Sequence, residues 1–189
     1  MMDWLAKALK LPDFYVASTG GSGGGVIQGT ASESVLVTLL GARSKAIEKA
    51  KQSHPDWSEH LIRSKLVAYC SKEAHSSFER ATLLASVMCR KVKTDENHSL
   101  RGSDLKEAIK KDLDDQLIPF FVCATLGTTT ICSYDNLLEI GPVCKAHDLF
   151  FHIDAAYAGS AFICPEFRHY LNGVEFSDSF NFNPHKWLM

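Results

Sequence analysis

Short apolar runs alternate with segments of helical pattern along this chain, and no other feature limits the fold as strongly. Residues 66–70, 118–125 and 149–154 are apolar runs of strand length, and residues 88–93 and 178–183 are further strand candidates. Strands that alternate with helices are typical of layered α/β proteins in which the sheet is largely parallel. We therefore predict a single α/β domain whose mostly parallel sheet is flanked by helices.

Helical patterns occupy the segments between these runs. Apolar residues recur at helical spacing from Ser32 to the break at His54, and either Ser32 or Thr30 fits the helix cap. Ser103 fits the cap of a second helix. Further helices are predicted in several shorter segments, namely residues 3–10, 76–86, 103–111 and 136–147. Glycines crowd residues 20–25, which predicts a turning or flexible loop before the long helix.

Composition and charge exclude several classes of function. The 189 residues are 46% hydrophobic and 22% charged with a formal net charge of −2, as expected of a globular domain without a nucleic-acid or anionic-membrane partner. The chain has neither an apolar segment long enough to span a bilayer nor a signal-peptide pattern at its start. Its six cysteines are scattered without a Cys-x-x-Cys pair, so we predict no metal site and a reducing, cytoplasmic location.

Polar residues follow three of the predicted strands. Asp154 ends the strand at 149–154, residues 125–129 follow the next, and residues 70–75 follow the strand at 66–70. Ligands of open α/β sheets gather beyond the carboxyl ends of the strands. We therefore expect these three polar clusters to lie at one edge of the sheet and to form a ligand site.

Lys186 and Asp154 together supply what pyridoxal phosphate chemistry needs. An amine holds the cofactor aldehyde, and a carboxylate keeps the pyridine nitrogen protonated so that the ring accepts electrons. An apolar, partly buried setting, which Phe182, Trp187 and Leu188 would provide, favours the neutral amine that attacks an aldehyde. Taken singly, Lys186 also fits an exposed surface lysine, and Asp154 a turn or cap aspartate.

Other residues fit a pyridoxal phosphate site in weaker ways. His75 would stack on the pyridine ring, although a loop histidine without such a role is the commoner case. Thr129 would reach a ring oxygen or the substrate carboxylate, or simply stabilise a turn. The phosphate would lie at the helix start near Ala31 and Ser32, with donors from Ser179 and Asn183. His185 is either close to the phosphate or structural.

Several segments resemble one known family. They read HSS at 75–77, ATLGTT at 124–129, HIDAAYAG at 152–159, PEFRH at 165–169 and NFNPHKW at 181–187. These segments are similar to those of the group II pyridoxal-phosphate decarboxylases, above all the aromatic-amino-acid branch in animals, and the resemblance covers essentially the whole chain. It implies the large cofactor-binding domain of the aspartate aminotransferase-type fold, called fold type I, for residues 1–189.

The resemblance also assigns roles to residues. It implies that Lys186 binds the cofactor aldehyde, Asp154 pairs with the pyridine nitrogen and His75 stacks on the ring, which makes these three the catalytic residues. Cofactor contacts are implied for a larger set, namely Ala31, Ser32, His75, Thr129, Asp154, Ala156, Ser179, Asn183, His185 and Lys186. The implied reaction is decarboxylation of dopa, 5-hydroxytryptophan or tyrosine to the amine, which would belong to aromatic amino acid metabolism.

Two residues separate this chain from related branches of the family. Insect aldehyde synthases typically carry asparagine at the position of His75, and histidine decarboxylases commonly carry serine at the position of His185. Both residues favour an amine-forming enzyme that acts on an aromatic substrate, with tyrosine decarboxylase, histidine decarboxylase and aldehyde synthase as alternatives. Transamination and oxidative deamination are further alternatives with the same cofactor.

Members of the family are longer than this chain at both ends. The resemblance implies that an N-terminal segment that interlocks two subunits, a mobile catalytic loop with a tyrosine, and a small C-terminal domain lie outside residues 1–189. We therefore expect a homodimer in the full-length form and negligible turnover by this chain alone. A non-catalytic chain that associates with a full-length subunit is the remaining alternative.

Overall fold

The sheet is parallel throughout, as the alternation of strands and helices predicts. The computed structural model describes residues 1–188, and within them five strands pair in the order β2-β1-β3-β4-β5. Every pair in this order is parallel. The strands are β1 (Leu66–Ser71), β2 (Met88–Val92), β3 (Ile118–Thr125), β4 (Phe150–Asp154) and β5 (Ser179–Asn181). Each strand begins and ends within two residues of its predicted bounds, and β5 is the shortest.

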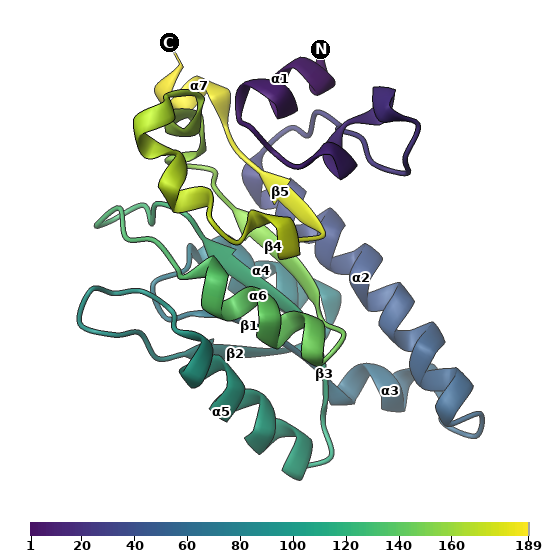
Figure 1. Cartoon of the computed structure of the whole chain (residues 1–189). Helices are drawn as coiled ribbons and strands as arrows, with labels where there is room; N and C mark the ends of the chain where they lie inside the picture. Colours follow the sequence, from purple (N-terminus) through teal and green to yellow (C-terminus); the bar gives the residue numbers. More distant parts are fainter. Residues whose placement is uncertain (189) are drawn as a thin grey trace.

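Helices cover both faces of this sheet (Figure 1). The longest is α2 (Ala31–Ser53), which shares one face with α3 (Glu59–Lys65) and α4 (Ser76–Ala85). The opposite face is covered by α5 (Gly102–Asp114) and α6 (Leu137–Ala146). The remaining elements are α1 (Met2–Ala8), α7 (Pro184–Trp187) and the 3₁₀ turns η1 (Asp13–Tyr15), η2 (Ala17–Thr19), η3 (Gly159–Ile163), η4 (Pro165–Leu171) and η5 (Val174–Phe176). The result is a three-layer α/β/α domain.

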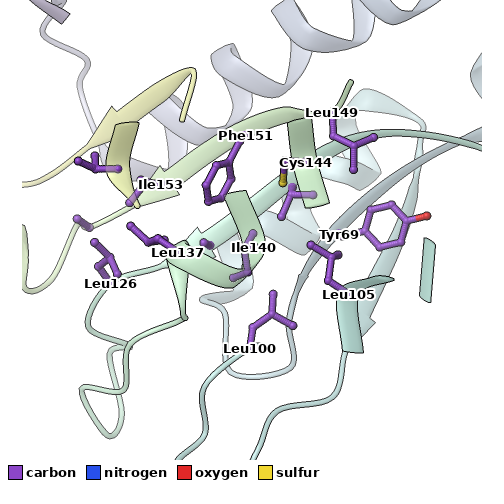
Figure 2. Close-up of a cluster of buried hydrophobic side chains, with 14 of the residues drawn as sticks. Tyr69, Leu100, Leu105, Leu126, Leu137, Ile140, Cys144, Leu149, Phe151 and Ile153 are labelled. Atoms are coloured by element: carbon purple, nitrogen blue, oxygen red, sulfur yellow. The ribbon is translucent and has the colours of Figure 1, made fainter. Parts of the chain in front are cut away.

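The two helical layers bury separate apolar cores. Figure 2 shows the core under α5 and α6, where Leu105, Ile140 and Phe151 lie close together. The other core places Leu39 and Phe78 against Phe121. Because β1 lies between these cores, all six of its residues are buried. A strand buried on both faces needs a continuous apolar run instead of an alternating one, which is what its sequence contains.

The start of α2 is fixed by a reciprocal cap. Thr30 Oγ1 accepts a hydrogen bond from the Glu33 backbone N–H at 3.1 Å, and the Glu33 carboxylate accepts one from Gly29 N–H at 2.8 Å. This arrangement is a variant of the capping box, in which the Glu33 carboxylate accepts from the residue before the cap. Thr30 is therefore the cap, and Ser32 lies inside the first turn.

The predicted cap at Ser103 is wrong. α5 begins at Gly102, and its N-cap is Arg101, whose side chain accepts no capping hydrogen bond. Gly102 N–H instead donates to Glu139 of α6 at 3.1 Å, and Arg101 forms an ion pair with the same carboxylate. A tertiary partner therefore satisfies the helix start, which local sequence does not reveal.

Candidate cofactor site

The polar clusters at the strand ends converge on one cavity. Its volume is about 160 Å³, and it lies beyond the carboxyl ends of β1, β3 and β4. The residues that line it are Thr30, Ala31, Ser32, His75, Ser77, Thr125, Gly127, Thr129, Asp154, Ala156, Tyr157, Asn183 and Lys186. The expectation that the three clusters share one sheet edge is therefore confirmed.

The amino end of α2 provides an anion site on one wall of the cavity. The capping box uses the N–H groups of Gly29 and Glu33, and the Ser34 N–H donates to the Thr30 carbonyl at 3.0 Å. Within the described residues, the N–H groups of Ala31 and Ser32 have no acceptor. Free N–H groups at the positive end of a 23-residue helix suit a phosphate group.

Asp154 presents a buried carboxylate to the same cavity. The residue is only 7% exposed, and its Oδ1 accepts hydrogen bonds from Ala156 N–H at 3.0 Å and Asn181 Nδ2 at 3.2 Å. Its Oδ2 receives no hydrogen bond from the residues that the structure describes. Thr125 Oγ1, on the neighbouring strand, is buried without a partner in this part of the chain. Buried polar atoms of this kind need a partner, and a polar ligand in the cavity would supply it.

His75 is held in place as the cap of α4. Its Nδ1 accepts a hydrogen bond from Ser77 N–H at 3.2 Å and lies 2.9 Å from the Ser77 hydroxyl. Because Nδ1 acts as an acceptor, the neutral ring carries its proton on Nε2. The cap fixes an imidazole beside the cavity, so His75 is more than an unengaged loop histidine.

Lys186 lines the cavity from the short helix α7. The partly buried apolar setting expected for this lysine is wrong, since Lys186 is exposed and Trp187 and Leu188 are 42% and 45% exposed. In the described chain α7 packs mainly against η3, and all four of its residues are exposed. The Lys186 Nζ lies 5.9 Å from the ring centroid of Tyr157, and that ring meets Trp187 edge-on at 5.3 Å.

Only some of the other predicted site residues line the cavity. Thr129, Ala156 and Asn183 line the cavity, whereas Ser179 and His185 do not. The Ser179 hydroxyl lies 2.7 Å from Nδ1 of His152 instead. His185 is exposed on α7.

Five residues that line the cavity received no cofactor role from the sequence, namely Thr30, Ser77, Thr125, Gly127 and Tyr157. The sequence predicts Thr30 only as a helix cap, and Thr125 and Gly127 only as members of the cluster at 125–129. Gly127 has a positive φ of +82°, and a Cβ at this position would lie 2.3 Å from the Ala158 Cβ. The signal in the sequence is a glycine directly after an apolar strand, where close backbone approach is common.

A larger hollow of about 260 Å³ lies at the opposite, amino-terminal edge of β3 and β4. Its walls combine apolar residues such as Phe120 and Leu149 with the ends of Lys45 and Lys49. Lys49 forms an exposed ion pair with Asp148 there. The Asp148 carboxylate is thus paired with Lys49, Asp178 accepts a hydrogen bond from Phe151 N–H, and the helix end in this hollow is the carboxyl end of α2, which does not suit a phosphate group. Size alone therefore does not mark the site.

The smaller cavity fits pyridoxal phosphate in its donor set: free helix N–H groups for the phosphate, a carboxylate for the ring nitrogen and an amine for the aldehyde. A model of the pyridoxal-dependent decarboxylase conserved domain matches residues 1–189. The chain belongs to this family. Pyridoxal phosphate is thus the cofactor for which the site is built, and the fold is that of the family's fold type I enzymes.

Individual proteins that are similar to this chain support the family assignment. The chain is 59% identical over 189 residues to the aromatic-L-amino-acid decarboxylase of Drosophila melanogaster, and this match covers 100% of the chain but 37% of the relative. The structure of Oryza sativa TDC with PLP matches with a TM-score of 0.93 and 41% identity, over 100% of this chain and 40% of the other. Rhodiola rosea 4-hydroxyphenylacetaldehyde synthase matches with a TM-score of 0.90 and 41% identity, over 99% and 39%. The chain therefore spans about two fifths of the length of these proteins.

None of the helices formed by residues 1–188 has the length and apolar character required to cross a membrane.

Proposed function

We propose that this chain is the cofactor-binding part of an enzyme that decarboxylates an aromatic L-amino acid, namely dopa, 5-hydroxytryptophan or tyrosine. The observation that carries the proposal is that Lys186 and the buried Asp154 line one cavity with the free end of α2. The identity of 59% to an aromatic-L-amino-acid decarboxylase supports the reaction class. With dopa as substrate, the enzyme would serve catecholamine biosynthesis.

Different residues of this chain would hold different parts of the cofactor. Bound pyridoxal phosphate supplies the sink for the electrons released when the carboxylate leaves as CO₂. The N–H groups of Ala31 and Ser32 would bind its phosphate, and Asp154 Oδ2 would hold a proton at its ring nitrogen. Lys186 provides the amine that anchors the aldehyde.

The remaining cavity residues orient the ring and the substrate. His75 presents its imidazole to the ring face from the α4 cap, where it is also placed to move a proton through Nε2. Ala156 would pack against the ring, and Thr129 would offer a hydroxyl from the cavity wall. Orientation of the bond that breaks contributes most of what the protein itself adds to the rate.

Aldehyde formation is the alternative that has specific support. The Rhodiola rosea neighbour is a 4-hydroxyphenylacetaldehyde synthase, and it shares the fold at 41% identity. His75 favours the amine, because insect aldehyde synthases typically carry asparagine at that position. Products decide between the two. An amine with CO₂ and no oxidant consumed supports amine formation, whereas an aldehyde with CO₂, ammonia and hydrogen peroxide, formed with dioxygen as the oxidant, contradicts it.

Covalent trapping tests the cofactor site directly. The 189-residue chain is incubated with pyridoxal phosphate, reduced with borohydride and digested, and the labelled peptide is identified by mass spectrometry. We expect the label on Lys186 and its loss in Lys186→Arg. Lys145, which is not among the cavity-lining residues, provides the matched control Lys145→Arg, and it should retain the label on Lys186. A label on peptides without Lys186 would exclude the assignment.

We further propose that the full-length form is a cytoplasmic homodimer and that this chain alone has negligible turnover. The aromatic-L-amino-acid decarboxylase of Drosophila melanogaster is a longer protein, and the residues matched by this chain make up 37% of it. Trp4, Val26 and Ile27 are 75%, 74% and 78% exposed on segments that lead to the cavity wall at Thr30, and such apolar surface favours association. Sedimentation and amine assays on the 189-residue chain and on a full-length form test both points. Robust amine production by the chain alone would contradict the second.

A further inference from the structure

Three polar side chains lie behind Asp154, and the cofactor contacts do not account for them. His152 and Asp154 are two residues apart on β4 and therefore point to the same face of the sheet. Their partners on β5 are Ser179 and Asn181, since the register pairs residue 152 with 179 and residue 154 with 181. His152 is only 1% exposed, so an imidazole stands inside the domain next to the carboxylate.

Two hydrogen bonds already connect these side chains. Asn181 Nδ2 donates to Asp154 Oδ1 at 3.2 Å, and the Ser179 hydroxyl lies 2.7 Å from His152 Nδ1. Two buried atoms remain without a partner among the described residues, namely His152 Nε2 and Asn181 Oδ1. Nε2 of His152 is a potential donor, and Oδ1 of Asn181 is an acceptor. The two residues lie on the paired strands β4 and β5.

Chemistry fixes the direction of every proton in the set. An ionised Asp154 only accepts, so the Asn181 amide turns its NH₂ toward the carboxylate and its oxygen away from it. The structure shows no hydrogen bond between that oxygen and His152 Nε2, but a proton on Nε2 would give the oxygen the donor that it lacks. Nδ1 is then an acceptor, and the Ser179 hydroxyl donates to it.

We propose that Ser179, His152 and Asn181 form a positioning relay that holds the Asp154 carboxylate in place with its Oδ2 toward the cavity. In this relay Ser179 Oγ–H donates to His152 Nδ1, His152 Nε2–H donates to Asn181 Oδ1, and Asn181 Nδ2–H donates to Asp154. The role of the relay rests on the proposed function of Asp154. The three residues are positioning residues, because none of them lines the cavity.

The neutral character of the relay matters for the cofactor. Burial lowers the pKa of His152, against the opposing effects of the Asp154 charge and the Asn181 side chain, and this keeps the imidazole uncharged. A lysine or arginine in this place would neutralise Asp154 and compete with a protonated ring nitrogen. Within the described residues, Asp154 receives hydrogen bonds only from a backbone N–H and an amide, so its full charge remains for the ligand.

This assignment also gives Ser179 a role that differs from phosphate binding. Its hydroxyl is engaged with His152, and it does not line the cavity. The relay therefore predicts that Ser179→Ala acts on the ring-nitrogen end of the cofactor instead of the phosphate end.

Nitrogen NMR of the histidine rings tests the relay without any cofactor. The 189-residue chain is labelled with ¹⁵N in its histidines, and the His152 signals are assigned by their loss in His152→Gln. We expect a neutral ring protonated on Nε2, with a slowly exchanging ring N–H. A proton on Nδ1, or a charged ring at pH 7, would overturn the proposal. Because this measurement needs no ligand, it stands even if the proposed function fails.

Cofactor analogues test what the relay does. Affinity is measured for pyridoxal phosphate and for an analogue in which carbon replaces the ring nitrogen. We expect Asn181→Ala to weaken pyridoxal phosphate about tenfold, as the loss of a hydrogen bond to a charged group predicts, and to leave the analogue within about twofold. Ser179→Ala should act in the same direction but more weakly, because it is two steps further away. Equal weakening of both ligands would show a merely structural role and overturn the proposal.

A control variant separates the two hypotheses. Asp154→Asn in the same assay should lose the preference for pyridoxal phosphate over the carbon analogue. If it keeps that preference, Asp154 does not face the ring nitrogen and the proposed function fails, whatever the ring NMR shows. If it loses the preference while Asn181→Ala does not, the relay fails and the proposed function stands.

Discussion

Gly127 lies so close to Ala158 that a Cβ on residue 127 would be 2.3 Å from the Ala158 Cβ. These residues belong to the loops that follow β3 and β4, and this contact sets the distance between them. The two loops carry Thr129 and Ala156 on the wall of the cavity. The missing side chain of Gly127 is therefore a condition for the geometry of the site.

Gly127→Ala should destabilise the chain and enlarge the gap between these loops. The φ of +82° and the contact with Ala158 both oppose a side chain, and together they should cost about 2–4 kcal/mol of unfolding free energy. Gly41→Ala is the matched control, since it lies inside α2 with no atom within 4 Å of the added Cβ, and it should stabilise by about 0.5–1 kcal/mol. Urea unfolding measures both. Equal effects of the two variants would contradict the role of the contact.

Thr30→Ala should remove the cap of α2. Thr30 Oγ1 accepts from Glu33 N–H at 3.1 Å, and loss of such a cap typically costs about 1 kcal/mol. Thr30→Ser retains the hydroxyl and should remain within about 0.5 kcal/mol of the parent chain in urea unfolding. Because the same helix end forms the phosphate wall, the alanine variant should also bind pyridoxal phosphate more weakly. Unchanged affinity and stability in Thr30→Ala would contradict both roles of the helix start.

Asp135 should make stability fall as pH rises from about 4 to 6. Its carboxylate is buried, and it accepts from Thr125 N–H at 2.7 Å and Leu100 N–H at 2.8 Å. Burial outweighs these hydrogen bonds and raises the pKa of Asp135 to about 6, from 3.8. Between these values the folded chain binds the extra proton, so the contribution of this group is full below pH 3.8 and is lost as pH passes 6.

The measurement for Asp135 is the difference in pH slope between the parent chain and Asp135→Asn. The asparagine variant is expected to be less stable overall. Its amide NH₂ group would face one of the two backbone N–H groups, and two donors cannot form a hydrogen bond with each other. Its stability should nevertheless lose the fall between pH 4 and 6, which we expect to be about 1–3 kcal/mol in the parent chain. Identical slopes in chemical denaturation would show that Asp135 is ionised throughout this range.

Local pattern predicted the elements that carry the site. The apolar runs that became β1, β3 and β4 are long enough to be read from sequence, and the rule for parallel sheets then placed His75, Thr129 and Asp154 together. The helix α3 was missed because it spans only seven residues and directly precedes a strand. The successive 3₁₀ turns η3 to η5 were also missed, since their short hydrogen-bonding pattern leaves no long periodic signal.

Tertiary contacts explain what the sequence could not show. In the sequence, Ser179 is a serine in an extended segment without a visible partner. Only the pairing of β4 with β5 places its hydroxyl next to His152. The exposure of Lys186 depends on which elements pack over α7, and periodicity carries no such information. Family resemblance named the residues of the site, while the hydrogen bonds behind Asp154 became visible only in the fold.

His75→Asn should separate the two tasks of this residue. Asparagine is a favoured helix cap, so it can replace Nδ1 as the acceptor of Ser77 N–H, and the unfolding free energy should change by less than about 0.5 kcal/mol. The imidazole that we propose to stack on the cofactor is lost, and loss of stacking worth about 0.5–1.5 kcal/mol should weaken pyridoxal phosphate binding about three- to tenfold. His75→Ala loses the cap as well and should cost about 1 kcal/mol more in urea unfolding. If His75→Asn binds the cofactor as tightly as the parent chain, then His75 is a helix cap only and the stacking role is wrong.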